Sequence, residues 1–126
     1  MPIYYKVVSV INGKFYSYVV DRGPYRIEYK LGETITDTKL NGIFVFDSIK
    51  RAYEFFAPCN VFHVAILSVE SSDPILSLPY YYEPYSLVCG SVLKWKTLLY
   101  PWPLGTVCLQ SINVLKVEAE YIPDFK

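Results

Sequence analysis

The pattern of apolar and polar residues along the chain predicts a domain built mainly from β-strands. Residues 25–30 alternate strictly between large apolar and charged side chains, which is typical of a strand with one face in water. Residues 3–11 and 14–20 are rich in Val, Ile and Tyr and are separated only by Asn12 and Gly13. Because both residues of an Asn-Gly pair tolerate a positive φ, this spacing predicts a β-hairpin with a two-residue turn.

The other predicted strands are shorter or are bounded by turn residues. Gly32 is expected to bend the chain between the strand at 25–30 and its continuation at 33–36. Further segments with the length and composition of strands are residues 43–46, 61–70, 75–78, 86–95, 106–109 and 111–120.

One helix is predicted over residues 47–57. Asp47 is a suitable N-cap residue, and Pro58 cannot continue a helix. Apolar side chains recur there at i, i+3, i+4 and i+7, and we expect this stripe, formed by Ile49, Ala52, Tyr53 and Phe56, to face the sheet. Residues 1–126 are therefore expected to form a single β-rich domain of the α+β class, with a mixed or mainly antiparallel sheet and one main helix.

Composition and charge narrow the range of partners. The chain is 52% hydrophobic and 17% aromatic, and its 12 basic and 12 acidic residues give a formal net charge of zero. Nucleic acid is not the expected partner, because such binding usually requires a basic excess. No apolar run reaches the ~18 residues that span a membrane, and the first residues lack a signal-peptide pattern, so we expect an intracellular protein. The apolar excess favours burial against a protein partner, most simply in a homodimer.

The sequence contains no assembled catalytic set. His63, the one histidine, lies in a strongly apolar segment, where we expect a satisfied residue of the sheet rather than a catalytic base, with a role as a pH switch as the alternative. The glycines are isolated from one another, so no phosphate-binding loop is predicted. No cofactor is expected, and the leading hypothesis is a non-enzymatic interaction module that uses aromatic loops or an uncovered sheet edge as its interface.

The three cysteines, Cys59, Cys89 and Cys108, lack the paired spacing of a zinc or redox site. We expect buried thiols that pack as small apolar side chains, and no metal. One disulfide, between Cys89 and Cys108, is an alternative, and a zinc site that adds His63 is formally available.

Two proline-bounded aromatic segments, at residues 79–85 and 98–105, carry the candidate binding residues. Tyr and Trp offer large, rigid contact areas and are enriched at binding hot spots. Three interpretations stay open: an interface with a protein, loops that complete the core, and stacking on single-stranded nucleic acid with help from Lys94 and Lys96. The aromatic residues concerned are Tyr80, Tyr81, Tyr82, Tyr85, Tyr100 and Trp102.

Residues 42–70, GIFVFDSIKRAYEFFAPCNVFHVAILSVE, resemble the strand–helix–strand core of ADP-ribosyltransferase-like domains over about a quarter of the chain. That family uses an Arg or His on its first strand, a Ser or Tyr near the helix, and a late Glu-x-Glu pair. At the matching positions this sequence has Lys6, Ser48, and Glu118 with Glu120; Lys6 departs from the pattern and the Ser-Thr-Ser signature is absent. The resemblance implies a nucleotide-binding domain for NAD, active or inactive.

In composition the chain is also similar to small uncharacterised proteins of spherical viruses that infect Pyrobaculum, a hyperthermophilic crenarchaeon. Abundant Tyr, Ile, Val and Leu, with a single Met and a single His, carry this resemblance. It implies a viral protein of the host cytoplasm without an assigned activity. It also favours the disulfide alternative, because disulfides persist inside hyperthermophilic cells.

Overall fold

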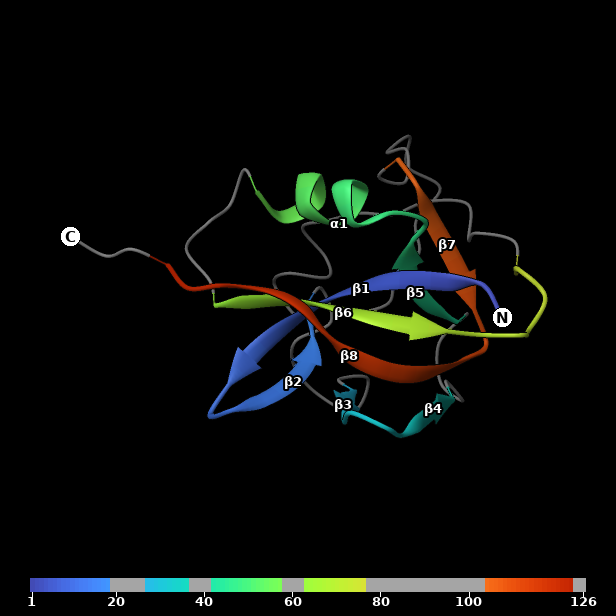
Figure 1. The fold of residues 1–126 in the computed structure, drawn as a ribbon, viewed down its shortest axis with the longest axis horizontal. Coiled ribbons are helices and arrows are strands. Elements are labelled where there is room, and N and C mark those ends of the chain that lie inside the picture. Colours follow the sequence, from blue (N-terminus) through green and yellow to red (C-terminus); the bar gives the residue numbers. More distant parts are fainter. Residues whose placement is uncertain (19–26, 37–41, 58–62, 77–103, 124–126) are drawn as a thin grey trace, which may run out of the picture.

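The computed structural model describes residues 1–18, 27–36, 42–57, 63–76 and 104–123 (Figure 1). Within these residues the chain forms a helix, α1 (Ile49–Phe56), and eight strands. The strands are β1 (Ile3–Ile11), β2 (Lys14–Ser17), β3 (Glu28–Tyr29), β4 (Thr34–Thr36), β5 (Ile43–Phe46), β6 (Val64–Glu70), β7 (Thr106–Leu109) and β8 (Ser111–Tyr121). The expected α+β class, β-rich with one main helix, is confirmed.

The main sheet has two ends that are joined by the chain itself. Its strand order is β3-β2-β1-β6-β8-β4, and each of these pairings is antiparallel. Only residues 30–33 separate β3 from β4 in the chain. Val114 accepts a backbone hydrogen bond from Gly32 (2.8 Å) and donates one to Glu33 (2.9 Å), which extends the β4–β8 ladder to this connection. One segment therefore pairs with β2 at its start and with β8 at its end, and the sheet closes on itself.

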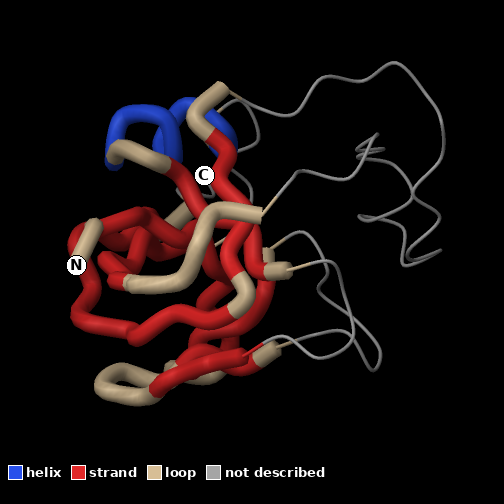
Figure 2. Tube along the Cα trace, turned by 90° about the vertical axis from the view of Figure 1, so that its right-hand side faces the viewer, coloured by secondary structure: helices blue, strands red, loops and turns tan. Residues whose placement is uncertain are grey.

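The closed sheet encloses the larger of two cores. Successive side chains of a strand point to opposite faces, so β1 and β6 each contribute to both cores. The enclosed core consists of Tyr4, Val8, Tyr29, Ile43, Val45, Ala65, Leu67, Val69, Leu109, Ile112 and Val114. The second core lies between the sheet and α1, which covers one outer side of the strands (Figure 2), and consists of Val7, Phe46, Ala52, Phe56, Val64 and Ile66.

The hairpin between β1 and β2 confirms the interpretation of the Asn-Gly pair. Asn12 and Gly13 both have positive φ, 53° and 75°, and Ile11 pairs with Lys14 directly across the turn. Gly32 has a φ of 80° at the predicted bend before β4. The predicted strands at 43–46 and 106–109 also match β5 and β7, whereas the strand predicted at 86–95 lies outside the described residues.

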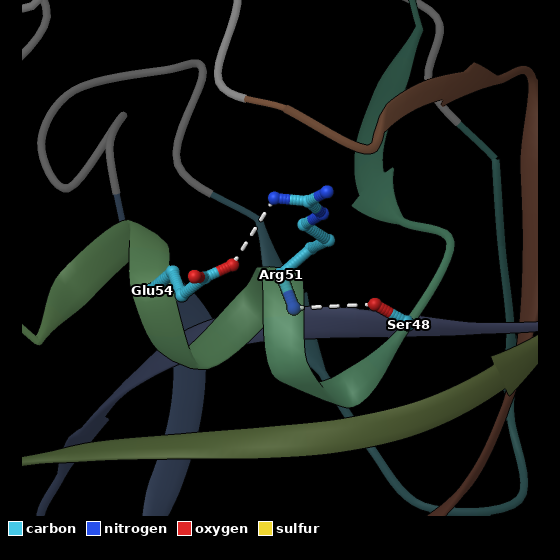
Figure 3. Close-up of polar contacts among 3 residues, drawn as sticks. All are labelled: Ser48, Arg51 and Glu54. Atoms are coloured by element: carbon cyan, nitrogen blue, oxygen red, sulfur yellow. Dashed lines mark hydrogen bonds and ion pairs between the residues drawn. The ribbon is translucent and has the colours of Figure 1, made fainter.

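The start of the helix differs from the prediction by one residue. Ser48, rather than Asp47, is the N-cap, and its hydroxyl oxygen accepts a hydrogen bond from the Arg51 backbone N–H at 3.2 Å (Figure 3). The Asp47 N–H instead donates to the Gly105 carbonyl at 2.9 Å, continuing the contact between the β5 and β7 segments. Because Asp47 still belongs to that ladder, the next polar residue caps the helix.

The buried face of α1 is also rotated from the predicted stripe. Ala52 and Phe56 are buried as expected, and Phe55 packs beside them. Ile49 and Tyr53 remain 41% and 45% exposed, so the prediction that they face the sheet is wrong. The Tyr53 ring lies at the margin of the second core, with centroids 5.5 Å from Phe56 and 5.4 Å from Tyr121. The helix has only eight residues, or little more than two turns, and its buried residues are Ala52 and Phe56.

Candidate functional site

The C-terminal part of β8 has an uncovered edge in the part of the chain that the structure describes. On one side, β8 pairs with β6 as far as Tyr121. On the other side, β4 pairs only with residues 111–113, and its connection reaches Val114. Figure 1 shows β4 beside the beginning of β8 only. Residues 115–121 therefore present backbone N–H and C=O groups that no described strand uses, and such an edge can accept a further strand.

The side chains on this edge are apolar as well as charged. Leu115 and Val117 are 39% and 37% exposed, which is unusual for two aliphatic residues at an open edge of a sheet. Lys116 lies between them with its side chain 71% exposed, and its Nζ is 3.7 Å from the Glu118 carboxylate. A strand with exposed aliphatic residues and charges of both signs combines contact area with the means to select a partner.

Two irregularities interrupt the ladder between β8 and β6. The register shifts between Ile66 and Leu67 and again between Ser68 and Val69, so that Glu118 and Leu115 each stand as an extra residue in β8. Such bulges bend and twist a strand and are a common way to limit pairing at an edge. The regular stretch open to a further strand is therefore short and is centred on Lys116 and Val117.

A second unusual feature is a lysine inside the closed sheet. Lys6 lies on β1 between Tyr4 and Val8, on the face that lines the enclosed core, and it stands opposite Leu67 of β6. Its ammonium donates a hydrogen bond to the Phe44 carbonyl at 2.8 Å and lies 5.5 Å from the centroid of the Tyr29 ring. These contacts connect β1 with β5 and β3, so the lysine ties three parts of the fold together.

Enclosure changes the acidity of this lysine. The residue keeps partial solvent exposure, but the surroundings of its ammonium are filled with protein atoms. Desolvation lowers the pKa of Lys6 from 10.5 to about 8, and the coulombic interaction with Cys108 opposes that shift. An amine with this pKa is partly neutral near pH 8, where ordinary lysines are charged.

The residues named by the ADP-ribosyltransferase resemblance have separate partners. Ser48 caps α1, Glu118 neighbours Lys116, and Glu120 neighbours His63. Within the described residues, none of these three makes a hydrogen bond or ion pair with another of them or with Lys6. The strand–helix–strand order of the segment, β5-α1-β6, is present.

His63 stands just before β6 and is less well satisfied than the sequence suggested. Its Nε2 lies 3.1 Å from the Glu120 carboxylate, yet this buried nitrogen has no hydrogen bond of good geometry. The contact brings an imidazole and a carboxylate together beside the last residues of β8.

Several predicted site residues lie outside the described residues. They are the aromatic residues Tyr80, Tyr81, Tyr82, Tyr85, Tyr100 and Trp102, and the cysteines Cys59 and Cys89. Cys108 is buried in β7, and its pairing with Cys89 stays a prediction. Within the described ranges, no three His, Cys, Asp or Glu side chains gather in a group that could hold a metal ion. No helix in the same ranges is long and apolar enough to cross a membrane.

The sequence predicts the strand that forms β8 but not its uncovered edge. The pattern of residues 111–120 predicts a strand but does not distinguish a central strand from an edge. Comparison with known proteins adds nothing further, since no family model, curated protein or solved structure matches the chain.

Proposed function

We propose that this protein is a non-enzymatic interaction module that self-associates as a homodimer through the uncovered edge of β8. The observation that carries the proposal is the edge of residues 115–121 on the side away from β6, which no described strand pairs and where Leu115 and Val117 are exposed. An open strand edge with exposed aliphatic side chains binds another strand readily, because backbone hydrogen bonds and side-chain contacts form together.

The charge of the chain supports a second copy of itself as the partner. With a formal net charge of zero, two copies do not repel each other over long range. The edge itself carries Lys116 beside Glu118 and Glu120, so it can offer complementary charges to an identical strand. The aromatic segments around Tyr81 and Trp102 would add contact area if they adjoin this edge.

The resemblance to small viral proteins of hyperthermophiles bears on where the module would act, since those proteins have no assigned activity. Interaction modules of this size work by assembling with themselves or with other proteins. We infer that the module acts inside the host cell, in a viral assembly or on a host protein, with the homodimer as the working unit.

Sedimentation velocity tests the proposal directly. Purified chain should change from monomer to dimer as its concentration rises from about 1 to several hundred µM, because a short edge-to-edge interface gives a weak dimer. A monomer throughout that range would contradict the proposal. The experiment should be run with and without reductant, so that a dimer held by cysteine oxidation is recognised.

A further inference from the structure

The side chains of the β8 edge also indicate how two copies would align. This inference rests on the proposed function, because it specifies the pairing within that homodimer. In a two-fold dimer of antiparallel strands, one residue lies opposite its own copy, and the pairing of every other residue follows from that choice. The alignments can therefore be compared through the charges that each one brings together.

Most alignments place like charges opposite each other. An axis at Lys116 opposes two lysines, and an axis at Glu118 opposes two glutamates. An axis at residue 119 puts Glu118 opposite Glu120 of the other copy, and an axis at Glu120 again opposes two glutamates. Like charges directly opposite each other destabilise a strand pair.

An axis at Leu115 would place the second copy on residues 111–114, which β4 and its connection already cover. Among the axes from residue 116 to residue 120, the geometry points to the one that remains: we propose that β8 pairs with β8 of a second copy in antiparallel fashion, with Val117 opposite Val117. Lys116 of each copy then faces Glu118 of the other, which gives two equivalent ion pairs. Leu115 faces residue 119 of the other copy, so aliphatic side chains flank the ion pairs and cover one another.

The local structure fits this alignment. Lys116 and Glu118 already lie on the same side of β8, since their charged groups are 3.7 Å apart within one chain. Two copies thus bring four alternating charges together on one face. The stretch between the bulges at Leu115 and Glu118 contains Lys116 and Val117, so the proposed axis passes through its regular part.

Reversing charges one at a time and then together tests the alignment. Lys116→Glu alone or Glu118→Lys alone converts two attractive pairs into two repulsive ones, and each should raise the dimer dissociation constant about tenfold. The double variant K116E/E118K exchanges the charges and should return the dissociation constant to within about threefold of wild type. Lys50→Glu on the exposed side of α1 carries the same change in net charge as K116E and should have no effect.

Cysteine cross-linking provides a second, independent measurement. Under mild oxidation Val117→Cys should form a covalent dimer well above the background of the three native cysteines, because opposite residues in a strand pair approach to about 5 Å. Leu115→Cys should not form this covalent dimer. Position 115 of the second copy lies about four residues, or roughly 13 Å, further along the partner strand.

The outcomes separate this alignment from the proposed function. If wild type dimerises but both single charge reversals leave the dissociation constant unchanged, or if L115C cross-links faster than V117C, the alignment is wrong and the homodimer stands. If wild type remains monomeric at every concentration, both the homodimer and its alignment are wrong.

Discussion

The enclosed lysine predicts an unusual dependence of stability on pH. Below pH 8 Lys6 carries its proton in both the folded and the unfolded chain, so the folded state holds a charged amine inside the sheet at a cost. Between pH 8 and 10.5 the unfolded chain still binds that proton, whereas the folded chain has released it. The free energy of unfolding should therefore rise with pH across this window and level off above it.

The size of this rise in the free energy of unfolding follows from the change in the pKa of Lys6. A lowering from 10.5 to about 8 corresponds to about 3 kcal/mol at ~1.36 kcal/mol per tenfold change in the proton-binding constant. The partial exposure of the residue makes this an upper value, since solvent reduces the penalty of the charge. The hydrogen bond to the Phe44 carbonyl survives deprotonation, because a neutral amine still donates.

The assay compares wild type with Lys6→Met, which keeps the length of the side chain and removes the titrating group. Chemical denaturation at intervals from pH 7 to 10.5 gives the free energy of unfolding of each protein. The titration of groups that do not interact with Lys6 affects both chains alike, so the difference, wild type minus variant, isolates Lys6 together with its interaction with Cys108. This difference should increase by about 2–3 kcal/mol towards pH 10.5.

A difference that stays constant over the whole range would refute the reasoning, because it would mean that Lys6 has the same pKa in the folded and unfolded chain. A difference that falls with pH would show that the folded state favours the charged form. The exposed Lys30→Met serves as the control for the loss of one lysine from the chain.

Four further outcomes follow from local contacts. Ser48→Ala should lower the free energy of unfolding by about 1 kcal/mol through loss of the N-cap, whereas Asp47→Ala should have the smaller effect; the reverse order would contradict the cap assignment. Gly42→Ala should cost at least about 2 kcal/mol, because a Cβ there would overlap the Cys108 thiol at a φ of 127°, while Gly13→Ala, in open space, should cost about 1; equal effects would argue against a crowded Gly42. Asp73→Ala should cost about 1–3 kcal/mol, since its carboxylate accepts hydrogen bonds from the Ser111 backbone N–H (3.1 Å) and hydroxyl (2.7 Å); thermal unfolding at wild-type temperature would refute this. Calorimetry with NAD should give no heat of binding, and a saturable signal would restore the ADP-ribosyltransferase hypothesis.

Local features of the fold could be predicted from the sequence because they depend on a few neighbouring residues. Asn12 and Gly13 supply the two positive φ angles that a tight hairpin needs, so the β1–β2 turn follows from the pair alone. The helix was equally clear from its periodicity. Its cap was misplaced by one residue because Asp47 and Ser48 are both good caps, and only the contact of Asp47 with Gly105, 58 positions later, decides between them.

The closure of the sheet and the β8 edge depend on long-range pairing that no local pattern encodes. Whether residues 111–120 form a central or an edge strand depends on where β4 begins, because the two strands are antiparallel, and the contacts of this segment with β8 reach no further than Val114, opposite the bend at Gly32. The enclosed position of Lys6 could not be predicted from the sequence for the same reason. A lysine beside Tyr4, Tyr5 and Val7 is typical of a water-facing position, and only the closed sheet places it in the interior.

Hydrogen–deuterium exchange at low and high protein concentration tests the central claim most directly, because it reports where the chains meet as well as whether they do. In dilute solution the outward backbone amides of residues 115–121 should exchange quickly, since no described strand covers them. At concentrations where the dimer forms, the same amides should become protected, while those of the β1–β2 turn at Asn12 and Gly13 should not change. Protection that is independent of concentration, or that rises elsewhere while residues 115–121 remain fast, would contradict the account.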